Sequence, residues 1–210
     1  MTLVAFNLNT DREYEKTIII DAGHGGIDPG TNLEGITEKD INLKIAKYLA
    51  EYLSNKNIEV IMTRTDDSLY QDDRNKDIIH RVEVANQSQA DLMISIHVNS
   101  FSTAESFGGQ VFYSQHSSEG ENLAAEIQKK LVEIQPDNRR EIASAPYYIL
   151  RKTNITTVLV ETGFITNPQD RKRLTSAQGQ KKTAKAIGEG IINFLETKPA
   201  FKERNKKTLV

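Results

Sequence analysis

The chain has 210 residues, of which 38% are hydrophobic, and its 27 basic and 29 acidic side chains give a formal net charge of -2. That length supports one well-buried domain, and the balanced charge does not mark a nucleic-acid or membrane-surface protein. Because the chain has no cysteine, disulfides, cysteine-zinc sites, iron-sulfur clusters and thiol nucleophiles are excluded. Histidines and carboxylates remain as the strong metal ligands, and we expect no nucleic acid as a partner.

The ends of the chain carry no targeting pattern. No run approaches the roughly 18 apolar residues of a transmembrane helix, so we expect no membrane span. Residues 1–10 lack the basic start and long apolar region of a secretory signal, so either the protein is cytoplasmic or its export segment has been removed. Residues 1–16 are predicted to be a polar lead-in and residues 197–210 a mobile basic tail.

Strand and helix patterns alternate between these ends, which predicts one α/β domain over residues 17–196. Apolar runs predict strands at residues 17–20, 58–63, 91–99, 108–114 and 156–160. Helical spacing predicts helices at residues 37–55, 78–87, 121–134 and 178–195. We therefore expect a mostly parallel, twisted sheet of about six strands, flanked by helices on both faces.

Two details of these elements are also predicted. Thr37 and Asp40 fit a capping box at the start of the first helix. Asn167 and Pro168 are expected to break the chain before the last helix.

Three predicted strands lead into side chains that suit catalysis. The first runs into His24, the third carries His97, and the last leads into Glu161. Because the carboxyl ends of parallel strands face the ligand crevice, His24 and His97 converge if their strands are neighbours. A carboxylate after an apolar run is costly unless it is paired or functional, so Glu161 either bonds loop amides or takes part in the chemistry.

Glu38 is a fourth candidate, although a carboxylate in the first turn of a helix is stabilised there without any metal. Catalytic zinc sites use three ligands of the His₂Glu kind, and a further carboxylate accepts a proton from the attacking water. The four side chains therefore predict metal-assisted amide hydrolysis. Another first-row metal would fit the same ligands.

Four motifs occur in order along the chain. They are Asp21-Ala22-Gly23-His24-Gly25-Gly26, Glu38-Lys39-Asp40-Ile41-Asn42-Leu43, Ser95-Ile96-His97-Val98-Asn99 and Val160-Glu161-Thr162-Gly163-Phe164-Ile165-Thr166-Asn167. Together they resemble the motifs of zinc-dependent N-acetylmuramoyl-L-alanine amidases of the amidase_3 family, and Arg81 and residues 148–151 also look like family positions. The resemblance covers residues 17–196.

The resemblance implies that His24, Glu38 and His97 bind one Zn²⁺ per chain and that Glu161 is the catalytic carboxylate. It implies cleavage of the amide between N-acetylmuramic acid and the L-alanine of the peptidoglycan stem peptide. Zinc would polarise the carbonyl and lower the pKa of its bound water, while Glu161 would pass the water's proton to the leaving amine.

Three further residues are candidates for supporting this site. Asp21 is equally suited to orienting a ligand histidine and to bonding loop amides. Asn99 and Arg151 are candidates for ligand support or for contact with the substrate.

The resemblance also bears on the subgroup and the cellular setting. Division-associated members carry a helical insertion over the zinc site, and residues 100–107 are too short to hold one. Without an appended wall-binding repeat, the chain looks like compact members of the spore cortex and germination subgroup, in which muramic acid loses its peptide before forming a δ-lactam.

Such an enzyme would act outside the cytoplasm, in the cell envelope or spore cortex. Its substrate would be peptidoglycan, and a separate envelope protein would activate or target it. Two alternatives stay open, a zinc peptidase acting on free peptides and a non-catalytic cell-wall-binding domain.

Overall fold

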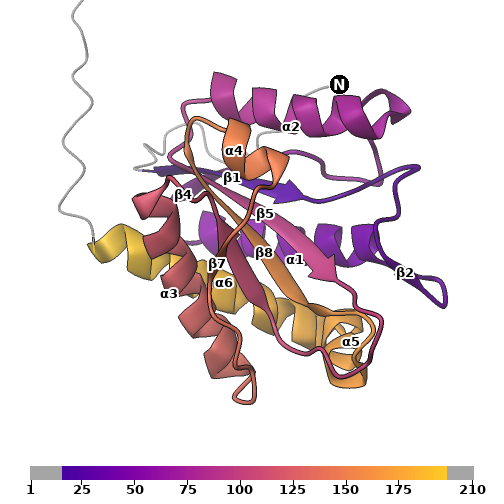
Figure 1. The fold of residues 1–210 in the computed structure, drawn as a ribbon. Helices are drawn as coiled ribbons and strands as arrows, with labels where there is room; N and C mark the ends of the chain where they lie inside the picture. The colour runs from indigo at the N-terminus through magenta and orange to yellow at the C-terminus, as the bar shows by residue number, and fades with distance from the viewer. Residues whose placement is uncertain (1–15, 198–210) are drawn as a thin grey trace, which may run out of the picture.

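The computed structural model describes residues 16–197. Six of its strands form one sheet, namely β1 (Lys16–Ala22), β4 (Ile58–Met62), β5 (Leu92–Asn99), β6 (Gln110–Tyr113), β7 (Ala143–Ser144) and β8 (Thr156–Phe164). Their order is β4-β1-β5-β8-β6-β7, and only β6 against β8 is antiparallel (Figure 1). A separate hairpin joins β2 (Asn32–Leu33) to β3 (Ile36–Thr37). The predicted α/β class and mostly parallel sheet of about six strands are confirmed.

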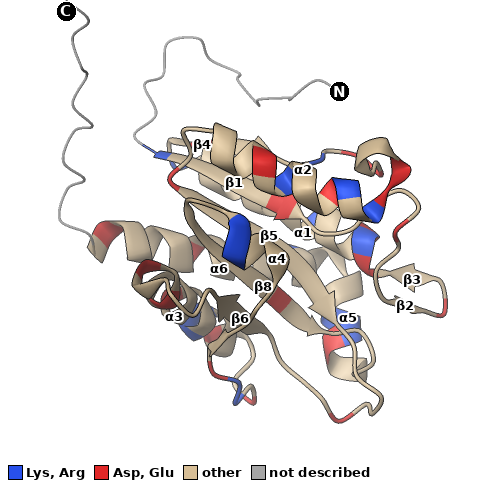
Figure 2. Ribbon diagram, turned by 45° about the horizontal axis from the view of Figure 1, so that its top comes forward, with Lys and Arg blue, Asp and Glu red and all other residues tan. Residues whose placement is uncertain are grey.

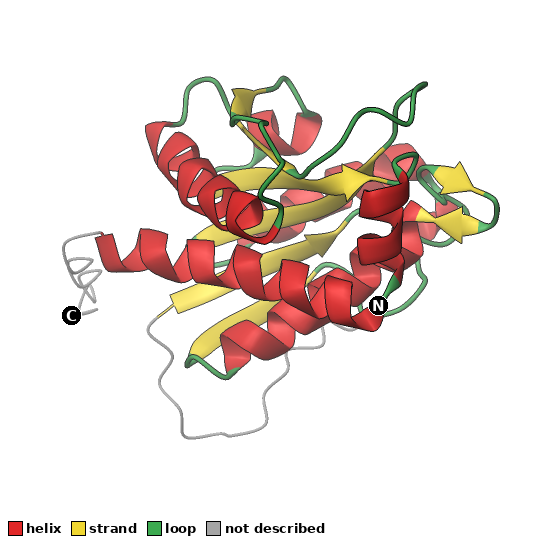
Figure 3. Cartoon of the chain, turned by 90° about the horizontal axis from the view of Figure 1, so that it is seen from below, coloured by secondary structure: helices red, strands yellow, loops and turns green. Residues whose placement is uncertain are grey.

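Helices cover both faces of the sheet, as predicted. On one face lie α1 (Glu38–Ser54), α3 (Ser118–Ile134) and α6 (Ala177–Thr197), whose apolar stripes pack on the larger core. Figure 3 shows these long helices lying together across that face. On the other face, α2 (Arg74–Gln87) and α4 (Tyr148–Lys152) cover a smaller core. No helix within residues 16–197 is long and apolar enough to cross a membrane.

The alternation of side chains along each strand decides which face carries the chemistry. Ile19, Met93 and Leu159 belong to the smaller core, under α2 and α4. Since residues two apart in a strand point to the same face, His97 and Glu161 lie on that face too, nearer the carboxyl ends of β5 and β8. In the pairing of these two strands, His97 is directly opposite Glu161.

Three local expectations are wrong. Thr37 precedes α1, but its hydroxyl donates to Asp40 Oδ2 (2.6 Å) and caps no backbone N–H. Asn167 and Pro168 do not break the chain but start α5 (Pro168–Thr175), because the Asn167 side chain accepts two backbone N–H groups and proline suits the first helical position. In addition, α2 begins at Arg74, four residues earlier than predicted, after a short 3₁₀ turn, η1 (Tyr70–Asp72).

The two ends predicted from composition lie almost wholly outside the described residues. Lys16 differs from the prediction because it already belongs to β1, and Thr197 because it ends α6.

Candidate active site

The loop after β1 holds His24 in an unusual backbone conformation. Its φ angle of 63° lies in the left-handed region, which costs free energy for any residue other than glycine. Two arginines that are each only 3% exposed hold the loop in place. Arg81 donates to the carbonyl oxygens of Ala22 (2.7 Å) and His24 (2.8 Å), and Arg64 donates to the carbonyl oxygen of Gly23 (3.0 Å). These charged donors stabilise the strained turn.

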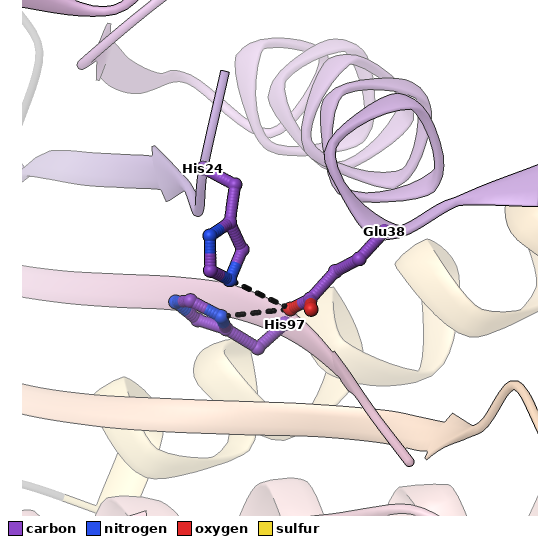
Figure 4. Close-up of side chains that lie close together, drawn as sticks. All are labelled: His24, Glu38 and His97. Atoms are coloured by element: carbon purple, nitrogen blue, oxygen red, sulfur yellow. Dashed lines mark hydrogen bonds and ion pairs between the residues drawn. The ribbon is translucent and has the colours of Figure 1, made fainter. Parts of the chain in front are cut away.

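Three predicted ligands converge at this edge of the sheet (Figure 4). Glu38 Oε1 lies 3.2 Å from His24 Nε2 and 3.0 Å from His97 Nδ1. All three ligand atoms lie within 4.8 Å of one another, the one such group among the described residues. Ligand atoms placed tetrahedrally around a zinc ion are separated by roughly 3.3 Å. The donor set therefore fits zinc in its chemistry, and the two separations from Glu38 Oε1 are close to this value.

Glu38 is held from several sides. Its Oε2 accepts the Thr31 N–H (2.9 Å), and its Oε1 accepts the Val98 N–H (3.0 Å) and the Asn42 side-chain amide (3.3 Å). Burial opposes ionisation, but hydrogen bonds and charge from the two histidines hold the pKa of Glu38 far below its ordinary value. Gly30, with φ of 62°, leaves the room for this carboxylate, because a Cβ there would lie 2.6 Å from Glu38 Oε2.

A second carboxylate faces the other ring nitrogen of His24. Asp28 Oδ2 lies 2.7 Å from His24 Nδ1. Burial lowers the pKa of His24, but the contacts with Glu38 and Asp28 outweigh burial and raise it to about 9. The ring is thus fixed between two acids, of which only Glu38 also approaches His97.

Asp21 does neither of the two things expected of it. It is 1% exposed and accepts hydrogen bonds from Arg81 (2.6 Å), from the Thr63 hydroxyl (2.8 Å) and from the Ser95 hydroxyl. Burial raises the pKa of Asp21, but the charge of Arg81 and the Ser95 hydrogen bond outweigh burial and hold it at about 2. Within residues 16–197, the carboxylate of Asp21 accepts no hydrogen bond from a loop amide or a ligand imidazole, so Asp21 reaches the histidine loop through Arg81.

Glu161 lies within β8 rather than after it, beside His97. Its Oε2 is buried and has no hydrogen-bond partner among residues 16–197, so the expected alternative of bonding to loop amides does not apply to this oxygen. Burial and the nearby charge of Glu38 raise the pKa of Glu161 to about 7, against the opposing charges of His97 and His24. This is the environment that a carboxylate needs to exchange protons near neutral pH.

Residues 18–193 match the Amidase_3 family, whose description is N-acetylmuramoyl-L-alanine amidase. The chain belongs to this amidase family. The amidase is 38% identical over 184 residues to the uncharacterized protein YqiI of Bacillus subtilis, covering 86% of this chain and 85% of YqiI. It is 32% identical over 192 residues to the germination-specific N-acetylmuramoyl-L-alanine amidase of the same organism, covering 87% and 81% of the two chains.

A solved structure agrees with this membership. The CwlD amidase of Clostridioides difficile, solved in complex with the GerS lipoprotein, superposes with a TM-score of 0.83 at 37% identity. The match covers 87% of this chain and all of that one. The resemblance seen in the four motifs is therefore confirmed at the level of family and fold.

Two of the candidate supporting residues lie outside the ligand cluster of the amidase. Asn99 follows His97 by two residues on β5, and its side-chain oxygen accepts the Ser100 N–H (2.8 Å). Arg151 is exposed and belongs to the last turn of α4, where Figure 2 shows basic residues. Together with His116 and Thr156 it lines a cavity at the amino end of β8. Thr156 begins that strand, five residues before Glu161. The structure does not bring Arg151 to the ligands.

Other residues of the amidase site were missed from the sequence. Asn42 interrupts the buried stripe of α1 one turn after Glu38, and that polar residue among apolar ones was a signal. Arg64 follows β4 closely, at the same sheet edge as His24, which was a weaker signal. Asp28 stands in an irregular loop, where no periodicity points to it.

Proposed function

We propose that this amidase is a zinc-dependent hydrolase that cleaves the amide between N-acetylmuramic acid and the L-alanine of the peptidoglycan stem peptide. The observation that carries the proposal is the convergence of His24, Glu38 and His97 beside Glu161, whose buried Oε2 has no hydrogen-bond partner in the described part of the chain. Three donors for a cation and one free carboxylate make up the set that metal-assisted amide hydrolysis requires. The catalytic domain proposed here spans residues 17–196.

Each residue has a distinct part in the reaction. His24, Glu38 and His97 would hold a zinc ion, whose chemistry would be to polarise a carbonyl and to make water a better nucleophile at neutral pH. Glu161 accepts the proton of the attacking water on its free Oε2. The same carboxyl group then returns this proton to the amine of L-alanine as the carbon–nitrogen bond breaks. A carboxylate with a pKa raised to about 7 suits both transfers.

We place the reaction in the cell envelope and, more narrowly, in the spore cortex. The germination-specific relative supports the narrower setting, and the lipoprotein bound to the CwlD amidase supports the envelope. The complex of CwlD with the GerS lipoprotein supports an accessory envelope protein as a partner that activates or targets this chain as well. Residues 100–109, between β5 and β6, contain no helix, which agrees with a site free of a blocking insertion.

The test uses purified chain and three substrates, namely vegetative peptidoglycan, spore cortex peptidoglycan, and the free stem peptide. We expect about one zinc ion per chain and release of peptides with a free L-alanine amine from the glycan-linked substrates. Cleavage within the free stem peptide would instead identify a zinc peptidase. Bound zinc with no release from any substrate, with or without an added GerS-type lipoprotein, would favour a cell-wall-binding domain.

A further inference from the structure

His24 presents its two ring nitrogens to two different carboxylates. Nε2 faces Glu38 Oε1 (3.2 Å) in the ligand cluster, and Nδ1 faces Asp28 Oδ2 (2.7 Å) on the opposite side of the ring. A neutral imidazole carries one hydrogen, so a carboxylate that accepts it at Nδ1 leaves the lone pair on Nε2. That lone pair is what a metal ion at the cluster requires.

The carboxylate of Asp28 is itself fixed. The backbone N–H of Asp28 donates to Gly25 O (2.8 Å), and the Gly25 N–H donates to Asp28 O (3.0 Å), which closes a small ring of backbone from Gly25 to Asp28, directly after His24. Asp28 Oδ1 accepts the Gly30 N–H (3.3 Å) and lies 3.3 Å from Arg74 Nε. One carboxylate oxygen is thus used to hold the side chain, and the other is left for the imidazole.

The geometry points to Asp28 as a positioning residue, which holds His24 in the tautomer and ring orientation that bind zinc through Nε2. The inference rests on the proposed zinc site. Carboxylates that accept the outer N–H of a ligand histidine fix the ring and make its free nitrogen a stronger donor. Asp28 acts through His24 and has no contact with the other two ligands among its hydrogen bonds and ion pairs.

The test measures zinc affinity by competition with a chelator, so it does not depend on turnover. We expect Asp28→Ala to weaken zinc binding by roughly 10- to 100-fold. Asp28→Asn should restore part of this loss, because its amide oxygen still accepts from Nδ1. The visible spectrum of the Co²⁺-loaded protein should change in Asp28→Ala, since the field at the metal depends on the orientation of His24.

Asp67→Ala is the matched control. Asp67 supports the same loop, since it accepts the Gly26 N–H (2.8 Å) and pairs with Lys39 (2.7 Å), yet it makes no contact with an imidazole. We expect this variant to keep the zinc affinity and the Co²⁺ spectrum of the wild type. If it loses as much affinity as Asp28→Ala, Asp28 supports the loop rather than the ring, and the inference falls.

The remaining outcomes are also decisive. Wild-type affinity in Asp28→Ala would overturn the role of Asp28 while leaving the zinc site intact. Absence of zinc binding in the wild type would overturn the metal site and this inference together. If Asp28→Ala does not fold, as judged by circular dichroism of the metal-free protein, Asp28→Asn decides the matter. Its zinc affinity must then be lower than that of the wild type, because a neutral amide is a weaker acceptor than a carboxylate.

Discussion

Two glutamates at the same edge of the sheet have opposite surroundings. Both oxygens of Glu38 accept hydrogen bonds, from two backbone amides and the side chain of Asn42. Glu161 has a buried oxygen with no partner within the described chain. The pKa of Glu38 is accordingly held far below its ordinary value, whereas burial raises the pKa of Glu161 to about 7. One carboxyl group stays an anion, and the other can change its protonation near neutral pH.

The two glutamates are therefore suited to different roles within one small site. Pairs of titratable groups whose pKa values are pushed apart mark the separate roles of acid, base and ligand. The donors around Glu38 also fix its position, which suits a metal ligand. Those donors are absent at Glu161 Oε2, which suits an atom that must take up and release a proton.

The largest expected effect comes from Glu161→Gln. The amide has nearly the same shape but cannot accept the water's proton, so we expect turnover on peptidoglycan to fall by roughly 10²- to 10⁴-fold. Zinc content should not change, because Glu161 is not one of the three ligands. Metal analysis and peptide release on the same preparation measure both quantities.

Glu141→Gln is the control for that variant, since Glu141 is exposed and is not a member of the ligand cluster. It should keep full activity. A Glu161→Gln protein that loses its zinc would show that the two glutamates are not separate in function, and would count against the division.

The next largest effect is on stability and concerns Arg81, which supports the loop of His24. Arg81 pairs with Asp21 and Asp77 and donates to the carbonyl oxygen of His24, all in the interior. Arg81→Met leaves two buried carboxylates without their cation, so we expect the free energy of unfolding to fall by about 3 kcal/mol or more. Urea denaturation of the metal-free protein measures this.

Lys185→Met gives the comparison for Arg81, because its partner Glu189 lies 3.6 Å away on the surface of α6. We expect little change in stability there. Equal stability in Arg81→Met and wild type would mean that the buried arginine does not hold the histidine loop.

The convergence of the three proposed ligands was predictable from the sequence. Parallel strands place their carboxyl ends at one edge, so His24 and His97 only needed neighbouring strands to meet, and β1 does pair with β5. Glu38 was predictable from its motif and from the start of α1. The supporting contacts were not predictable. Those of Asp28 depend on the conformation of its loop, and those of Asp21 depend on where α2 places Arg81.

The fold shows the same limit. Long apolar or amphipathic segments such as β5 and α6 were found almost at their true bounds. The two-residue strands β2, β3 and β7 were missed, because segments so short carry no periodicity. The helix α5 was missed because Asn167 and Pro168 can end one element or cap the next, and only tertiary packing decides between the two.

A smaller effect on the free energy of unfolding is expected at low pH. The pKa of Asp21 falls from its ordinary value of 3.8 to about 2 in the folded protein. The resulting stabilisation is fully present above pH 3.8 and is lost as the pH falls through about 2, and it amounts to about 2 kcal/mol. Urea denaturation between pH 5 and 2 should show this loss in the wild type. The loss should be smaller in Asp21→Asn, and equal slopes in the two proteins would contradict the assignment.

Gly23→Ala has the smallest expected effect and tests how rigidly the three proposed ligands are held. A Cβ at Gly23 would overlap the imidazole ring of His97, so the ring must move for the methyl group to fit. If the three proposed ligands are held as rigidly as the contacts of Glu38 suggest, zinc affinity should fall by roughly tenfold. Gly188→Ala is the matched control, because its Cβ would overlap the ring of Tyr52, between α6 and α1, and its nearest atoms belong to none of the proposed ligands. Unchanged zinc affinity in Gly23→Ala would mean that His97 adapts its position. The division between rigidly held ligands and a free proton acceptor would then apply to Glu38 and His24 but not to His97.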